Sequence, residues 1–287
     1  MSYVIYTDTG CDIKPELLKE WGVLAQSLSF RFTDEEKNYT EADMPIGEFY
    51  QQMRSGRVAK TAAVNALQFE NAFEEVLKEG NDLLYIGFSS GLSSTYNAGV
   101  LAAKELAGKY PERKIITVDS LAASAGQGLI VYLATKKKNE GASIEEAAEY
   151  VKYLVPKLAH WFTVDDLVYL KRGGRVSAAS AFFGNLLGIK PVLHVDDEGH
   201  LVPVNKVRGR RTSLMALVDA YGKYRDENED GTIFISCADC YDEANFIATE
   251  IKNKYGSEVM LITDVGAVIG SHSGPGTMAL FFVATKK

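Results

Sequence analysis

Short runs of β-branched and aromatic residues alternate with helix-like segments along the first half of the chain. The first three runs begin at Val4, Leu83 and Lys114, and each is followed by a polar turn. This alternation is typical of parallel strands joined by crossover helices, because each helix must cover one face of the sheet. We therefore expect an α/β fold in this half.

The pattern changes beyond a helix predicted to start at Ser143, whose hydroxyl can cap it with Glu146 three residues on. In residues 190–208, apolar and other side chains alternate on both sides of a polar turn that contains glycine, which predicts a β-hairpin. A chain of 287 residues is also long for one core. We expect two closely packed α/β lobes with mostly parallel sheets, residues 1–155 and 156–287.

The charge balance and the cysteine content exclude several classes of protein. A formal net charge of −7 argues against a nucleic-acid-binding surface. The chain has neither eighteen consecutive apolar residues nor a signal-like start, so stable membrane insertion is not expected. Three cysteines are too few to staple a secreted fold. We expect a cytoplasmic protein that binds no nucleic acid.

Hydroxyl side chains gather in residues 88–96, Phe-Ser-Ser-Gly-Leu-Ser-Ser-Thr-Tyr, between a predicted buried strand and a predicted helix. The free amides of a helix N-terminus, with hydroxyls around them, suit an anion such as a carboxylate or phosphate. A serine-capped helix start that binds nothing is the alternative. Thr61, which also precedes a predicted helix, has the same two interpretations.

Other polar residues at strand ends favour structural roles. Asp8 and Asp119 each follow a predicted strand, where aspartate commonly fixes a turn by accepting amide protons. Cys237 and Cys240 have the spacing of a redox pair, but Asp239 between them disfavours a thiolate. We expect unreactive thiols, and we assign no catalytic residue.

Two further segments could approach an anionic ligand. Residues 169–177 concentrate three cations around a double-glycine turn, which suits an acidic or phosphate group, with a solvated basic loop as the alternative. Residues 269–276 form a glycine-rich loop that exposes His272. The four histidines lack metal-ligand spacing, and no nucleotide-binding motif occurs, so neither a metal nor a cofactor is expected.

These segments, in this order, resemble the DegV family of fatty-acid-binding proteins. The matching segments are Thr7-Asp8-Thr9, Lys60-Thr61, residues 89–96, Val118-Asp119-Ser120, residues 169–175, Ile189-Lys190-Pro191 and residues 272–276. The resemblance implies a protein of phospholipid metabolism that is not an enzyme by itself. Such a protein binds one long-chain fatty acid and presents its carboxylate to a partner kinase, which forms an acyl phosphate.

The resemblance also implies roles for particular residues. Thr61 and Ser93 would hold the carboxylate, with Ser94 at the helix start and His272 near the head group. Arg172 would face the head-group opening and the kinase. The chain departs from the family pattern at Ala62-Ala63-Val64, where many relatives have Ser-Gln-Pro after the threonine.

The sequence leaves alternatives for the residues around the acyl chain and for the class of function. An apolar cluster after the basic segment is our candidate for the tunnel wall, with ordinary core packing as the alternative: Phe182, Phe183, Leu186, Leu187 and Ile189. The second hypothesis for function is an enzyme of phosphoryl or acyl transfer that acts on a phosphorylated metabolite. A purely regulatory protein is the third.

Overall fold

Four parallel strands form the sheet of the first lobe in the computed structural model, which describes residues 2–176 and 188–287. Their order in the sheet is β2, β1, β5, β6, and every ladder between them is parallel. All six residues of β5 are buried, as expected for a strand covered on both faces. The strands are β1 (Tyr3–Asp8), β2 (Val23–Gln26), β5 (Asp82–Gly87) and β6 (Ile115–Asp119).

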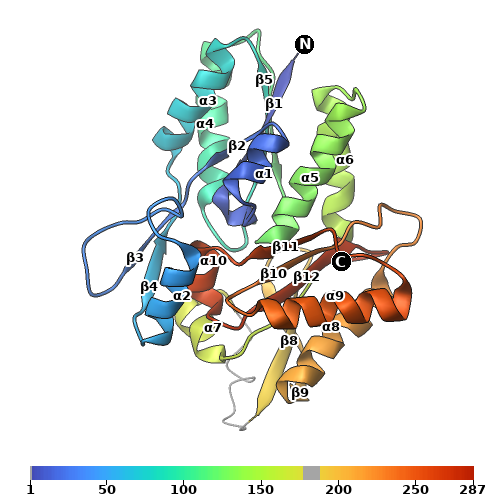
Figure 1. Ribbon diagram of the computed structural model, residues 1–287. Helices are drawn as coiled ribbons and strands as arrows, with labels where there is room; N and C mark the ends of the chain where they lie inside the picture. Colours follow the sequence, from blue (N-terminus) through green and yellow to red (C-terminus); the bar gives the residue numbers. More distant parts are fainter. Residues whose placement is uncertain (1, 177–187) are drawn as a thin grey trace.

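Helices cover both faces of this sheet (Figure 1). On one face α3 and α4 pack through Phe69, Phe73 and Leu106, and on the other face α5 and α6 pack against Leu84 and Ile86. The predicted capping box of Ser143 and Glu146 is confirmed at the start of α6. The helices of this lobe are α1 (Pro15–Glu20), α3 (Ala66–Lys78), α4 (Thr95–Lys109), α5 (Ala125–Asn139) and α6 (Ile144–Leu154).

A small two-stranded sheet projects from the first lobe toward the second. Strands β3 (Ser29–Phe32) and β4 (Ala59–Ala62) pair antiparallel, and α2 (Ile46–Arg54) lies between them in sequence. Phe49 of α2 packs in a core that also contains Val265 from the second lobe. This unit, which carries Thr61 to the boundary between the lobes, was not predicted from the sequence.

The second lobe contains a six-stranded sheet in the order β11, β10, β12, β7, β8, β9. Only β10 and β11 pair in parallel, and the other four ladders are antiparallel. The expectation of mostly parallel sheets therefore fails in this lobe, because the last strand, β12, inserts between β10 and β7. The strands are β7 (Leu158–Thr163), β8 (Ile189–Val195), β9 (Leu201–Arg208), β10 (Phe234–Cys237), β11 (Leu261–Asp264) and β12 (Met278–Val283).

One face of the six-stranded sheet packs on helices of its own lobe, and the other packs on the first lobe (Figure 1). Helices α8 and α9 cover the outer face through Leu217 and Ile247. On the inner face, Phe234 and Phe281 belong to the same core as Leu84 of β5. The helices are α7 (Leu167–Gly173), α8 (Arg210–Tyr224), α9 (Tyr241–Tyr255) and α10 (Ala267–Ser273), with short 3-10 turns at η1 (Thr9–Cys11) and η2 (Val155–Lys157).

The structure confirms the α/β fold class. The proposed boundary between residues 155 and 156 falls within η2, between the last helix of the first lobe and β7. Because one core runs through both lobes, their independence as domains stays a prediction. Among the described residues, no helix has the length and apolarity needed to cross a membrane.

Candidate functional site

A largely apolar cavity of about 150 Å³ lies between the two lobes. Phe88 and Ala123 contribute from the first lobe, and Phe162, Ala279 and Phe281 contribute from the inner face of the second sheet. The polar residues on its wall are Thr61, Ser93, Ser94, Ser124, His160, Arg175, Ser236, His272, Ser273 and Thr277. All four residues predicted to bind the ligand, Thr61, Ser93, Ser94 and His272, are in this set, so the fold brings together residues from three distant parts of the sequence.

Thr61 and His272 are in direct contact. The Oγ1 atom of Thr61 on β4 lies 2.8 Å from Nε2 of His272 on α10. Burial, together with the nearby Arg175, lowers the pKa of His272 to about 4, so the imidazole is neutral near pH 7. A neutral imidazole that donates from Nε2 to Thr61 leaves the threonine proton free for another acceptor.

Ser93 and Ser94 lie at the start of α4. The Oγ atom of Ser93 lies 2.9 Å from Oγ1 of Thr95 and accepts the Thr95 amide proton at 3.2 Å. Ser94 is the N-cap residue, but its side chain makes no capping hydrogen bond. The positive end of the helix dipole therefore meets the cavity beside two hydroxyls, an arrangement that favours an anion.

The two strand-end aspartates fix the loops beside these residues, as predicted. Asp8 accepts hydrogen bonds from the Tyr85 hydroxyl at 2.8 Å and from the Phe88 amide at 2.9 Å. Asp119 accepts the amide protons of Ser90 at 3.2 Å and Leu121 at 3.0 Å. Both carboxylates thus hold the first residues of the turn that carries Ser93.

The basic segment is mostly helical rather than a double-glycine turn. Residues Leu167–Gly173 form α7, and Gly174 terminates it in the left-handed conformation with φ of 66°. His272 likewise lies on a helix, α10, rather than on a glycine-rich loop. Helix α7 approaches α10 so closely that a methyl group added at Gly173 would lie 2.6 Å from Nδ1 of His272.

A second cavity, of about 410 Å³, adjoins the polar end of the first. Thr61, Arg175 and His272 line both cavities, while Lys60 and Arg172 line only the second. None of the described residues that line this second cavity is acidic, so three cations act there without a carboxylate among them. Arg172 therefore does not line the apolar cavity, but it lies in the cavity that adjoins its polar end.

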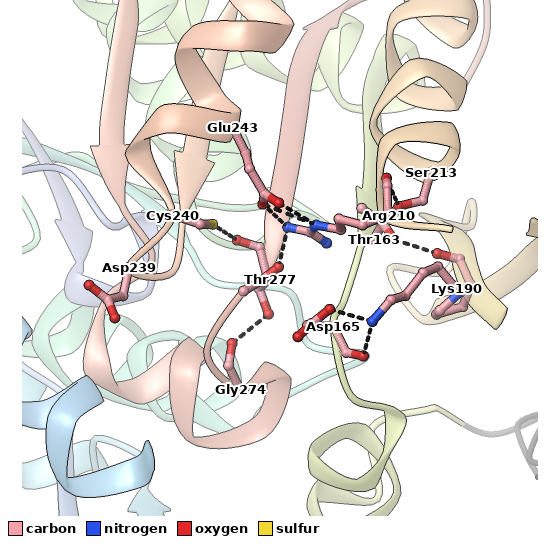
Figure 2. A network of polar contacts seen from close by, with 12 residues as sticks. Thr163, Asp165, Lys190, Arg210, Ser213, Asp239, Cys240, Glu243, Gly274 and Thr277 are labelled. Carbon is pink, nitrogen blue, oxygen red and sulfur yellow. Dashed lines mark hydrogen bonds and ion pairs between the residues drawn. The ribbon is translucent and has the colours of Figure 1, made fainter. Parts of the chain in front are cut away.

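A polar network holds the backbone that leads from α10 into β12 (Figure 2). Arg210, at the start of α8, donates to Glu243 of α9 at 3.0 Å and to the Gly276 carbonyl at 2.6 Å. The Thr277 hydroxyl donates to the Gly274 carbonyl at 2.7 Å. These contacts tie the loop after α10 to two helices of the second lobe.

The cysteine pair lies at the edge of the same network. The thiol of Cys240 donates to the Thr277 carbonyl at 3.5 Å (Figure 2). The hydrogen bond with Cys240, followed by burial, raises the pKa of Cys237. A raised pKa disfavours the thiolate that redox chemistry requires, which supports the interpretation of unreactive thiols.

Several residues of the site were not predicted from the sequence, and one expectation lies outside the described residues. Arg175 belonged to the basic segment but was not given a site role, and Ser124, His160 and Ser236 carried no local signal. The predicted tunnel wall at Phe182, Phe183, Leu186 and Leu187 lies outside the described residues, whereas Ile189 begins β8.

Comparison with known proteins agrees with the resemblance seen in the motifs. The model of the family described as "Uncharacterised protein, DegV family" matches residues 2–285. A DegV domain-containing protein of Clostridium perfringens is 41% identical over 286 residues, covering 99% of this chain and 98% of that protein.

Solved structures with the same fold include proteins described by their lipid ligands. A DegV family protein from Thermus thermophilus, described by its fatty acid binding, superposes with a TM-score of 0.87 at 28% identity, over 99% of this chain and 100% of that one. A DegV lipid-binding protein from Thermotoga maritima gives a TM-score of 0.84 at 28% identity, over the full length of both chains. The chain therefore belongs to the DegV family.

Proposed function

We propose that this protein binds one long-chain fatty acid between its lobes. The observation that carries the proposal is the convergence of Thr61, Ser93, Ser94 and His272 on one cavity whose remaining wall is largely apolar. The carboxylate would accept hydrogen bonds from the Thr61 and Ser93 hydroxyls, and the acyl chain would occupy the apolar part. Fatty acid binding by the relative from Thermus thermophilus supports this assignment.

The affinity would come mainly from the acyl chain. Burial of about sixteen carbons at roughly 0.8 kcal/mol per CH₂ supplies on the order of 10 kcal/mol. Ligand pockets commonly enclose about 300 Å³ or more, so the side chains around the 150 Å³ cavity would move apart on binding. The polar end would orient the head group rather than hold most of the ligand.

We further propose that the bound carboxylate is presented to a partner kinase. The cavity lined by Lys60, Arg172 and Arg175 adjoins the proposed head-group position, where a phosphoryl group would arrive. Cations placed there would stabilise the negative charge of the transferring group. The protein would act as the lipid-binding subunit, in the cytoplasm, and would catalyse nothing alone.

The same cations favour a second candidate, an enzyme of phosphoryl or acyl transfer that acts on a phosphorylated metabolite. Its substrate would place a phosphate in the 410 Å³ cavity and would leave the apolar cavity unused. A bound lipid distinguishes the two candidates, because a phosphorylated metabolite has no acyl chain to fill an apolar cavity.

The test is the mass of the native protein purified from cells, compared with its denatured mass. We expect a difference equal to about one fatty acid per chain, identified by lipid analysis after extraction. A protein that stays ligand-free after incubation with fatty acids would contradict the proposal. A mass difference that matches a phosphorylated metabolite would favour the second candidate.

A further inference from the structure

The cavity has a second polar surface, formed by Ser124 and Ser236. Their Oγ atoms lie 2.9 Å apart, Ser236 is fully buried in β10, and Ser124 is 5% exposed. Both residues line the apolar cavity. Neither belongs to the proposed carboxylate site, so their hydroxyls need a separate explanation.

Ser124 is held in an unusual backbone conformation. Its φ is 54° and its ψ is −150°, a region that residues other than glycine rarely adopt. The Ser124 amide donates to the Gly10 carbonyl at 2.8 Å. The hydroxyl of Ser124 also lies 2.5 Å from Oδ2 of Asp12, so three polar groups form the chain Asp12, Ser124, Ser236.

The protons in this chain can point in either of two directions. If Asp12 is ionised, Ser124 donates to it and Ser236 donates to Ser124, which leaves the oxygen of Ser236 as an unused acceptor. If Asp12 is protonated, it can donate to Ser124 and Ser124 to Ser236, which leaves the Ser236 proton as an unused donor. Burial, together with the nearby Glu41, raises the pKa of Asp12 well above its usual range.

Both directions leave Ser236 with unused hydrogen-bonding capacity inside an apolar cavity. Ser124 is the one hydrogen-bond partner of its hydroxyl among the residues that the structure describes. A methylene group of a plain acyl chain can pair with neither the unused acceptor nor the unused donor of Ser236. A carbonyl group can pair only with the unused donor, which occurs in the second direction. A hydroxyl group both donates and accepts, so it satisfies both.

The neighbours of Ser236 leave room for a substituent on the ligand. Ala279 is its direct cross-strand partner on β12, and both side chains line the cavity. Ala123, from the first lobe, lines the same cavity and is equally small. A polar group with small side chains beside it therefore interrupts a wall that contains the larger Phe162 and Phe281.

We propose that the cavity is built for an acyl chain that carries a hydroxyl group, which hydrogen-bonds to Ser236. The ligand class is thus a hydroxylated long-chain fatty acid. This inference rests on the proposed function, because it requires a fatty acid in the cavity between the lobes.

The test compares stearic acid with hydroxystearic acids whose hydroxyl is moved along the chain. Dissociation constants are measured by calorimetry for the delipidated full-length protein, as wild type, Ser236→Ala and Ser273→Ala. Ser273 is a matched control, because it lines the same cavity but donates its proton to the Ile269 carbonyl of its own helix at 3.2 Å. Comparing each acid between variants cancels the differences in solubility among the acids.

When the ligand carries its hydroxyl at one or two neighbouring carbons of the acyl chain, Ser236→Ala should weaken binding of that acid about two- to tenfold. This is the size of one net hydrogen bond. The same variant should bind stearic acid as tightly as wild type or more tightly, which also shows that it is folded. Ser273→Ala should change the dissociation constants of stearic acid and of every hydroxy acid by a common factor.

Two results would overturn the inference in distinguishable ways. If Ser236→Ala changes the dissociation constants of stearic acid and of every hydroxy acid by the same factor, Ser236 does not contact the hydroxyl group of the ligand. The fatty-acid function would still stand. If the wild type binds none of these acids, stearic acid included, the proposed function fails and this inference fails with it.

Discussion

Thr61 and Ser93 reach the polar end of the cavity from β4 and from the turn before α4, and only one of them is already bonded to a histidine. Thr61 contacts His272, whereas Ser93 contacts Thr95 of its own helix. In the proposed complex each hydroxyl would donate to one carboxylate oxygen. The two residues should therefore contribute separable hydrogen bonds to the same ligand.

We expect Ser93→Ala to weaken fatty-acid binding by about 1.5 to 3 kcal/mol, the contribution of one hydrogen bond to a charged group. Binding should not be abolished, because the buried acyl chain supplies most of the affinity. Calorimetric titration of the delipidated variant measures this. Ser90→Ala is the control, since Ser90 is exposed in the same turn and its hydrogen bond to Asp119 uses only the backbone amide. Equal affinities for the two variants would contradict the assignment.

Glu41 should make the stability of the protein depend on pH. Burial and the nearby Asp264, which itself lies 3.5 Å from the Lys14 amine, raise the pKa of Glu41 from 4.5 to about 7. The unfolded chain therefore binds fewer protons than the folded protein between these values, so stability falls as the pH rises through this window. Asp12, whose pKa is also raised, contributes in the same direction.

Glu41→Gln should lose less stability than wild type between about pH 5 and pH 8. Urea denaturation midpoints at several pH values measure the difference, and Glu48→Gln, at an exposed position of α2, serves as the control. If wild type and Glu41→Gln show the same dependence on pH, the carboxyl of Glu41 does not titrate in this window.

At the scale of helices, the contact between α7 and α10 sets the position of His272. Because Gly173 has a negative φ and its added methyl group would lie 2.6 Å from Nδ1 of His272, Gly173→Ala should displace the imidazole without straining the backbone. We expect fatty-acid affinity to fall on the order of tenfold, as for one lost charge-assisted hydrogen bond.

Gly108→Ala is the matched control for that substitution. Gly108 is exposed in α4, and an added methyl group would meet nothing within 4 Å. Alanine should stabilise this helix by about 0.5 to 1 kcal/mol and leave the affinity unchanged. Equal affinities for the Gly173→Ala and Gly108→Ala proteins would show that the contact between α7 and α10 does not control the site.

Elements with a local signature could be predicted from the sequence, and elements defined by distant pairing could not. The strand and helix around residues 88–96 and the capped helix at Ser143 follow from local patterns. The predicted hairpin at residues 190–208 is likewise confirmed as β8 and β9. The rest of the second sheet does not follow from local patterns, because the insertion of β12 between β10 and β7 joins segments more than a hundred residues apart. The β3 and β4 pair was missed for the same reason, since 26 residues separate the two strands in the chain.

The candidate site shows the same limit. Thr61, Ser93, Ser94 and His272 line one cavity, but their proximity was implied only by the family resemblance, since each local pattern was also consistent with a capped helix or a loop that binds nothing. Hydroxyls such as that of Ser236 acquire meaning only when folding places them on the wall of an apolar cavity.

In the whole molecule, two adjoining cavities at the boundary between the lobes correspond to the two tasks that the proposed function requires. The apolar cavity would hold the ligand, and the cationic cavity beside it would face the partner kinase. Arg172 lines only the cationic cavity, so it should act on presentation without much effect on retention. This arrangement makes the two tasks separable by one substitution.

Arg172→Ala should retain its fatty acid but support much less acyl-phosphate formation when the partner kinase and ATP are supplied. The physical reason is the loss of one cation near the proposed position of the transferring phosphoryl group, where charge stabilisation lowers the barrier. Lipid content and acyl-phosphate formation are measured in the same preparations of wild type, Ser93→Ala and Arg172→Ala at equal loading. Arg113→Ala is the control, because Arg113 bonds to the Gly80 carbonyl in a loop remote from both cavities. Should Arg172→Ala lose its lipid, or keep full turnover with the kinase, the division between holding and presenting would be wrong.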